Sequence, residues 1–195
     1  MIIVITPEKM VQNETDRING MFQEGLDLLH IRKPCMTAAE MTEYISRIHQ
    51  EFHQQLVLHS HYETAQDFMI SRLHFREADR QNERHTSFKG NIISTSVHDM
   101  ETFNGLGSEW EYAFISPVFP SISKKGYGEN SAVLHEIKKR NNPNVKLIAL
   151  GGIRQSNIQK ISGSRVDGVA LLGAVWECNE SIQMFRKCRQ HVLSL

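Results

Sequence analysis

The sequence has 195 residues, which is within the range of one compact α/β domain with a sizeable core. Its 22 lysine and arginine residues equal its 22 aspartate and glutamate residues, so no overall field favours nucleic acid or an anionic membrane. No apolar run approaches the roughly 20 residues of a membrane helix, and we expect a cytoplasmic protein. The cysteines, Cys35, Cys178 and Cys188, lack CxxC spacing, which argues against a disulfide framework.

Short runs rich in Ile, Val and Leu alternate with stretches of helical period, which predicts βα units and a parallel sheet. Eight strands in so short a chain favour one small (β/α)8 barrel domain over residues 1–195, with its active site at the C-terminal strand ends. A flavodoxin-like doubly wound sheet is the alternative. The expected strands are Ile2–Thr6, Leu28–Arg32, Leu56–Ser60, Arg72–Phe75, Ile92–Val97, Tyr112–Val118, Val145–Gly151 and Gly168–Gly173.

The clearest predicted helix begins after Thr37, because Thr37 and Glu40 have the spacing of a capping box. The polar segment 77–90 predicts a fourth helix that is short, distorted or replaced by a loop. Other helices are expected at Thr15–Glu24, Tyr62–Met69, Asp99–Leu106, Ser131–Arg140, Gln155–Ile161 and Asn179–Val192.

On a barrel, polar residues at the C-terminal ends of the strands would lie around one opening, the mouth of the barrel. They are His30, Arg32, His59, Ser60, His61, His74, Asp79, Ser96, His98, Ser116, Ser121, Ser123, Lys124 and Lys125.

Glycines end the last two predicted strands, at Gly151-Gly152 and at Gly173. Backbone amides in such loops bind phosphate in many barrels, although a glycine pair also serves as a simple tight turn.

Basic residues and histidines at the mouth leave several interpretations open. Lys124 beside Ser121 and Ser123 fits a diphosphate site or a solvated loop, and Arg32 fits a phosphate clamp or a packing ion pair. On a barrel, His59, His61 and His74 could form a metal or acid/base cluster.

Seven segments in order resemble the thiamine phosphate synthase superfamily, which includes the TenI-type thiazole tautomerases. They are LLHIRKP, LVLHSH, RLHFREAD, IISTSVHD, YAFISPVFPSISKKG, LIALGGI and GVALLGAVW. The resemblance implies a small (β/α)8 barrel that joins hydroxymethylpyrimidine diphosphate to thiazole phosphate, releasing diphosphate, with Mg²⁺. The implied partners are these two small molecules, and a homo-oligomer is left open.

The resemblance also implies roles for individual residues. Arg32 and Ser96 lie near the pyrimidine or the diphosphate, and Ser121, Ser123 and Lys124 hold the diphosphate; Arg32, Ser96 and Lys124 are the expected catalytic residues. Asp79 matches one of two magnesium-binding aspartates. Other substrate-binding positions are His30, His59, Gly151, Gly152, Leu172 and Gly173.

Two departures from the family pattern bear on activity. His59-Ser60 stands where the synthases have Asn-Asp, so one magnesium carboxylate is missing and we expect Mg²⁺ to bind weakly without substrate. The histidine typical of the tautomerases aligns with Pro117. We therefore expect a synthase-like transferase; the alternatives are a TenI-type tautomerase and a barrel that only binds thiamine precursors or products.

Overall fold

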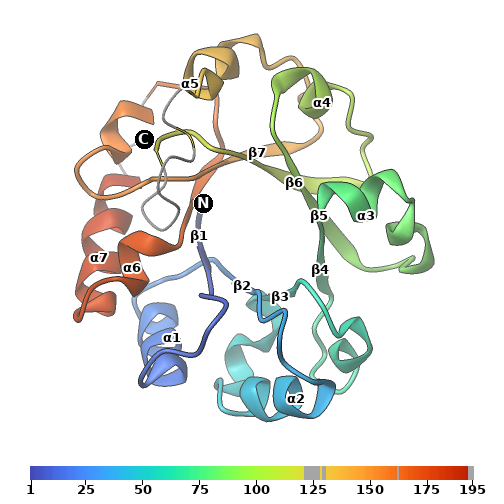
Figure 1. Ribbon diagram of the computed structural model, residues 1–195, viewed down its shortest axis with the longest axis vertical. Coiled ribbons are helices and arrows are strands. Elements are labelled where there is room, and N and C mark those ends of the chain that lie inside the picture. The colour runs from blue at the N-terminus through green and yellow to red at the C-terminus, as the bar shows by residue number, and fades with distance from the viewer. Residues whose placement is uncertain (121–127, 129–130, 162, 193–195) are drawn as a thin grey trace.

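The computed structural model describes residues 1–120, 128, 131–161 and 163–192. Eight parallel strands close into a barrel in chain order, and β1 pairs with both β2 and β8. The strands form an inner ring with the helices outside it (Figure 1). The strands are β1 (Ile2–Ile5), β2 (Leu28–Ile31), β3 (Leu56–Leu58), β4 (Arg72–Phe75), β5 (Ile92–Val97), β6 (Trp110–Ile115), β7 (Lys146–Leu150) and β8 (Gly168–Leu171). The predicted (β/α)8 fold is confirmed, and the doubly wound alternative is wrong.

The helices that cover the barrel are uneven in length. The α-helices are α1 (Glu14–Gln23), α2 (Ala38–Ser46), α3 (Glu77–Gln81), α4 (Met100–Asn104), α5 (Val133–Glu136), α6 (Gly173–Trp176) and α7 (Ser181–Val192). Short 3-10 helices are η1 (Gln50–Gln55), η2 (Tyr62–Ala65), η3 (Arg84–Ser87), η4 (Ile137–Lys139) and η5 (Ile158–Ile161). No helix in the described part of the chain is long and apolar enough to cross a membrane.

The predicted capping box is present at the start of α2. The Thr37 side chain accepts a hydrogen bond from the Glu40 amide, and the Glu40 carboxylate accepts one from the Thr37 amide. The expected helix at Tyr62–Met69 is wrong, because only the turn η2 forms and Met69 takes a left-handed φ of 55° that directs the chain into β4.

The barrel interior holds both apolar and polar side chains. Packed apolar side chains fill most of it: Ile3, Ile5, Leu28, Val57, Tyr112, Phe114, Ile148 and Ala170. Among them, His30 on β2, His74 on β4 and Ser94 on β5 are also buried, and both histidine rings contact Phe114. The buried polar groups are thus gathered on neighbouring strands of one side of the barrel.

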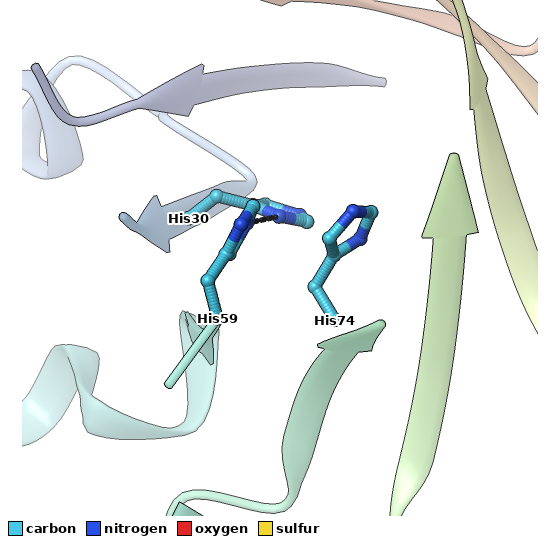
Figure 2. A group of neighbouring side chains, drawn as sticks. All are labelled: His30, His59 and His74. Carbon is cyan, nitrogen blue, oxygen red and sulfur yellow. Dashed lines mark hydrogen bonds between the residues drawn. The ribbon is translucent and has the colours of Figure 1, made fainter. Parts of the chain in front are cut away.

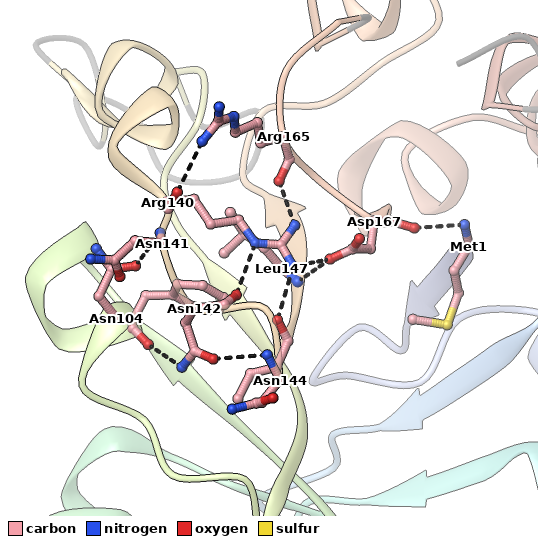
Figure 3. A network of polar contacts seen from close by, with 11 residues as sticks. Met1, Asn104, Arg140, Asn141, Asn142, Asn144, Leu147, Arg165 and Asp167 are labelled. Atoms are coloured by element: carbon pink, nitrogen blue, oxygen red, sulfur yellow. Dashed lines mark hydrogen bonds and ion pairs between the residues drawn. The ribbon is translucent and has the colours of Figure 1, made fainter.

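A polar network joins the chain segments that lead into β7, β8 and β1 (Figure 3). Arg140 donates to the backbone oxygens of Val145 and Arg165 and forms an ion pair of 2.8 Å with Asp167. The Asp167 carboxylate also accepts from the Leu147 amide at 2.7 Å. The network lies at the N-terminal strand ends, opposite the mouth, where it stabilises closure of the barrel.

Candidate functional site at the barrel mouth

Three histidines from adjacent strands gather inside the barrel. His30 lies on β2, His59 follows β3, and His74 lies on β4 (Figure 2). Each can offer one nitrogen such that all three atoms lie within 4.8 Å of one another. The cluster includes His30 in place of His61, whose ring instead lies 2.7 Å from the Met36 backbone oxygen.

Hydrogen bonds fix the three rings. Nδ1 of His30 lies 2.9 Å from Nε2 of His59, and Nε2 of His30 lies 2.7 Å from the Tyr112 hydroxyl. The two nitrogens of His74 lie 2.9 Å from the Ser94 hydroxyl and 3.0 Å from the Ser96 hydroxyl. Ser96, an expected catalytic residue, therefore belongs to the histidine cluster.

Burial keeps these histidines uncharged. It lowers the pKa of His74 to about 3, and it holds the pKa values of His30 and His59 well below the usual value. Neighbouring histidine and arginine charges lower the pKa values of His30 and His59 further. At neutral pH each ring offers a lone pair as well as an N–H.

A cavity of about 610 Å³ opens beside the cluster, after β2, β3 and β4. His59 forms part of its lining together with basic residues: Arg32, Lys33, Arg76 and Arg84. Arg76 and Arg84 are largely exposed, and Arg32 pairs with Glu8 at 2.5 Å. The cavity thus presents guanidinium groups to solvent, as an anion site does.

Two residues at positions linked to magnesium lie in this cavity, in surroundings that suit the ion poorly. The buried Ser60 hydroxyl has no hydrogen-bond partner within the described part of the chain. Both carboxylate oxygens of Asp79 accept from arginines, from Arg76 at 3.0 Å and from Arg84 at 3.2 Å. Burial raises the pKa of Asp79, but these hydrogen bonds outweigh it and the pKa lies below its usual value.

A second carboxylate in the cavity lining, Glu63, was missed by the sequence analysis. Its Oε1 atom lies 3.3 Å from Nδ1 of His61, and its side chain is exposed. To bind here, magnesium would have to displace the arginines from Asp79 or separate the Glu63 carboxylate from His61. The residues present therefore do not form a ready magnesium site.

A buried ion pair connects the segment after β2 to the neighbouring helices. Lys33 and Glu14 have no exposed side-chain surface, and Nζ lies 2.8 Å from the carboxylate. The Tyr44 hydroxyl donates to the same carboxylate at 2.5 Å. Lys33, next to Arg32 in the chain, therefore ties the start of the cavity wall to α1 and α2.

The glycine loops after β7 and β8 lie beside a separate, smaller cavity. Gly151 and Gly152 have φ values of 99° and 62°, and Gly173 begins α6 just after Leu172. Gly173, Arg154 and Ser156 contribute to a cavity of about 300 Å³. Among the described residues, Gly173 and Arg32 line different cavities. Ser121, Ser123 and Lys124 lie outside the described residues.

Comparison with known proteins shows which family this chain belongs to. The family model described as thiamine monophosphate synthase matches residues 2–175. The chain belongs to this family. The family's member from Lactococcus lactis, a thiamine-phosphate synthase, is 20% identical over 195 residues, covering 95% of this chain and 91% of that one.

Solved structures agree with the family and with the barrel. The thiamine phosphate pyrophosphorylase of Bacteroides thetaiotaomicron has a TM-score of 0.80 at 25% identity, over 97% of this chain and 96% of that one. The enzyme of the same name from Pyrococcus furiosus has a TM-score of 0.83 at 18% identity, over 99% and 95% of the two chains. The second likeness concerns the fold alone.

Sequence reasoning within the family missed Arg76, Arg84 and Tyr112. Arg84 stands in the polar segment 77–90, whose structure was predicted least clearly, and Arg76 comes directly before that segment. Tyr112 was counted only as the first residue of an apolar strand. The alternation of inward and outward positions along β6, which puts Tyr112 with Phe114 inside the barrel, was the available signal for the tyrosine.

Proposed function

We propose that the protein is a thiamine phosphate synthase-like transferase that joins hydroxymethylpyrimidine diphosphate to thiazole phosphate. In this reaction the C–O bond to the diphosphate breaks, and diphosphate leaves with the electron pair. The thiazole nitrogen then forms the new C–N bond to the pyrimidine methylene carbon. The observation that supports the proposal most directly is the arginine-lined cavity at the mouth of a barrel of this family.

The diphosphate group would lie among Arg32, Arg76 and Arg84. Their guanidinium groups supply planar N–H donors that suit phosphate oxygens, and they meet the charge that grows on the leaving group as the C–O bond breaks. The unpartnered Ser60 hydroxyl offers one more donor in the same cavity. Lys124, Ser121 and Ser123 remain proposed diphosphate ligands from the family resemblance.

The thiazole phosphate would lie at the smaller cavity beside the last two strands. Arg154 and Ser156 offer a charge and a hydroxyl there, close to Gly173. Gly151, Gly152 and Leu172 belong to the same pair of loops. Binding there would hold the thiazole at the mouth for attack, which is mostly positioning work.

Magnesium is the cation that the family's chemistry implies, and it would shield diphosphate charge. The residues described above fit it poorly, since Asp79 is already held by two guanidinium groups. The arginines carry the anion-binding role in this proposal. Asp79 orients Arg76 and Arg84 through its two hydrogen bonds.

The test is an assay by mass spectrometry of thiamine phosphate made from the two precursors, with and without Mg²⁺. Losing one charged hydrogen bond costs about 1.5–3 kcal/mol, so Arg76→Ala should lower kcat/KM roughly 10- to 150-fold. Arg47→Ala is the matched control, because Arg47 pairs with Glu43 on the surface of α2. Absence of product from the wild type under both conditions would contradict the transferase. Conversion of the thiazole precursor alone would support the tautomerase instead.

A further inference from the structure

The three clustered histidines have no role in the diphosphate chemistry just described. Three nitrogen ligands from β2, β3 and β4 converge at the inner edge of the cavity, and His59 lines that cavity. Imidazole nitrogen is a preferred ligand of zinc and a poor one for magnesium. We propose that His30, His59 and His74 bind one Zn²⁺ ion.

The spacing of the rings fits coordination of one ion. With Zn–N bonds of about 2.0–2.1 Å, two imidazole ligands of a tetrahedral site have ring centroids about 5 Å apart. The His30 centroid lies 5.1 Å from that of His59 and 5.2 Å from that of His74, and the remaining pair is 4.3 Å apart. The His59 and His74 rings are stacked with 25° between their planes, so one of these two rings must rotate for all three nitrogens to reach the ion.

Neighbouring hydroxyl groups hold the far side of two rings. If His30 ligates through Nδ1, its Nε2–H donates to the Tyr112 hydroxyl, 2.7 Å away. If His74 ligates through Nε2, its Nδ1–H donates to Ser94 at 2.9 Å. Zinc-binding histidines usually donate their other N–H in this way, which fixes the tautomer and the ring orientation.

Two of the three proposed ligands also lie away from solvent. His30 and His74 are almost fully buried, so their ligand nitrogens lie inside the barrel and not on its surface. His59 is the least buried ring and faces the cavity, so the ion would be reached from that side. With three protein ligands, a fourth position is left for water or a ligand atom, as in catalytic zinc sites.

The test reads metal binding rather than thiamine phosphate formation, so its outcome is separate from that of the proposed transferase. The full chain is stripped with EDTA and titrated with Zn²⁺ against a chromophoric chelator. We expect one equivalent to bind. His59→Ala should weaken binding by more than about 100-fold, since loss of a hydrogen-bond partner behind a ligand alone costs about 10- to 100-fold. Tyr112→Phe tests that smaller effect and should weaken binding about 10-fold.

His61→Ala is the matched control, because His61 also lines the cavity but bonds to the Met36 backbone oxygen outside the cluster. It should bind zinc as the wild type does. Circular dichroism establishes that each variant is folded. Co²⁺ provides a measurement that needs no variant, because its absorption spectrum distinguishes a four- or five-coordinate nitrogen site from an octahedral aqueous one. An octahedral spectrum, a wild type without stoichiometric zinc, or equal losses in His59→Ala and His61→Ala would overturn the proposal.

Discussion

At the scale of single residues, the buried ion pair of Lys33 and Glu14 has the largest expected effect on stability. Both side chains are fully buried, and Tyr44 completes the hydrogen bonding of the carboxylate. Burial lowers the pKa of Lys33 even though Glu14 opposes that shift. A buried charge is tolerated here because its partner is present, so removal of one partner leaves an unpaired charge in the protein interior.

Glu14→Leu should therefore lower the free energy of unfolding by about 3–5 kcal/mol. The double variant Glu14→Leu/Lys33→Met removes both charges and should recover most of that loss. Urea denaturation of the wild type, Glu14→Leu, Lys33→Met and the double variant measures the coupling energy between the two residues. Additive losses in the double variant would show that the ion pair has no coupling of this size.

At the scale of elements, the loop after β7 shows what a glycine pair does. At Gly152, φ is 62°, and an added Cβ would lie 2.1 Å from the Pro120 backbone oxygen. The glycine is thus required where two loops approach closely. From the sequence alone, the same pair was interpreted mainly as a phosphate site.

Gly152→Ala should destabilise the protein by several kcal/mol, since backbone strain of about 1–3 kcal/mol adds to a clash with backbone. Gly163→Ala is the control: Gly163 has a φ of 76° but nothing within 4 Å of an added Cβ. It should cost only about 1–2 kcal/mol, the penalty of a left-handed residue. Thermal unfolding followed by circular dichroism compares the two. Equal losses would contradict the role assigned to the close approach.

The sequence predicted strands better than helices, for a physical reason. Every strand was located because a barrel strand is buried on both sides and reads as an apolar run. The helical segments from 62 to 69 and from 155 to 161 were overestimated, because over so few residues apolar spacing does not distinguish a 3-10 turn from an α-helix. In the site, His30, His59 and Arg32 were expected at the mouth. The pairing of Asp79 with Arg76 and Arg84 depends on how a polar loop folds back, which periodicity does not reveal.

At the scale of the whole molecule, the two ends of the barrel carry different groups of polar residues. The polar network around Arg140 and Asp167 lies at the N-terminal strand ends (Figure 3), and the histidines and arginines lie at the other end. Arg140 is the centre of the network, since it bonds to Asp167 and to the backbone oxygens of Asn142, Val145 and Arg165, and its side chain is only 13% exposed.

Arg140→Ala should lower the free energy of unfolding by about 2–4 kcal/mol, because buried acceptors lose a charged donor. Binding at the opposite end should change little. Arg47→Ala removes an exposed ion pair and should change stability by less than about 0.5 kcal/mol. Urea denaturation gives both values. A loss for Arg140→Ala as small as that for Arg47→Ala would rule out a stabilising role for the network.

Closure of the barrel also sets a condition on how the chain folds during synthesis. β1 can complete its pairing only when β8 is available, and the register joins Ile2 to Val169. The ribosome must therefore have released almost the whole barrel before its first strand has both neighbours, and contacts of such long range form slowly. Until then the edge of β1 that pairs with β8 has no strand partner. The pairing that closes the barrel therefore comes after the rest of the sheet has been synthesised.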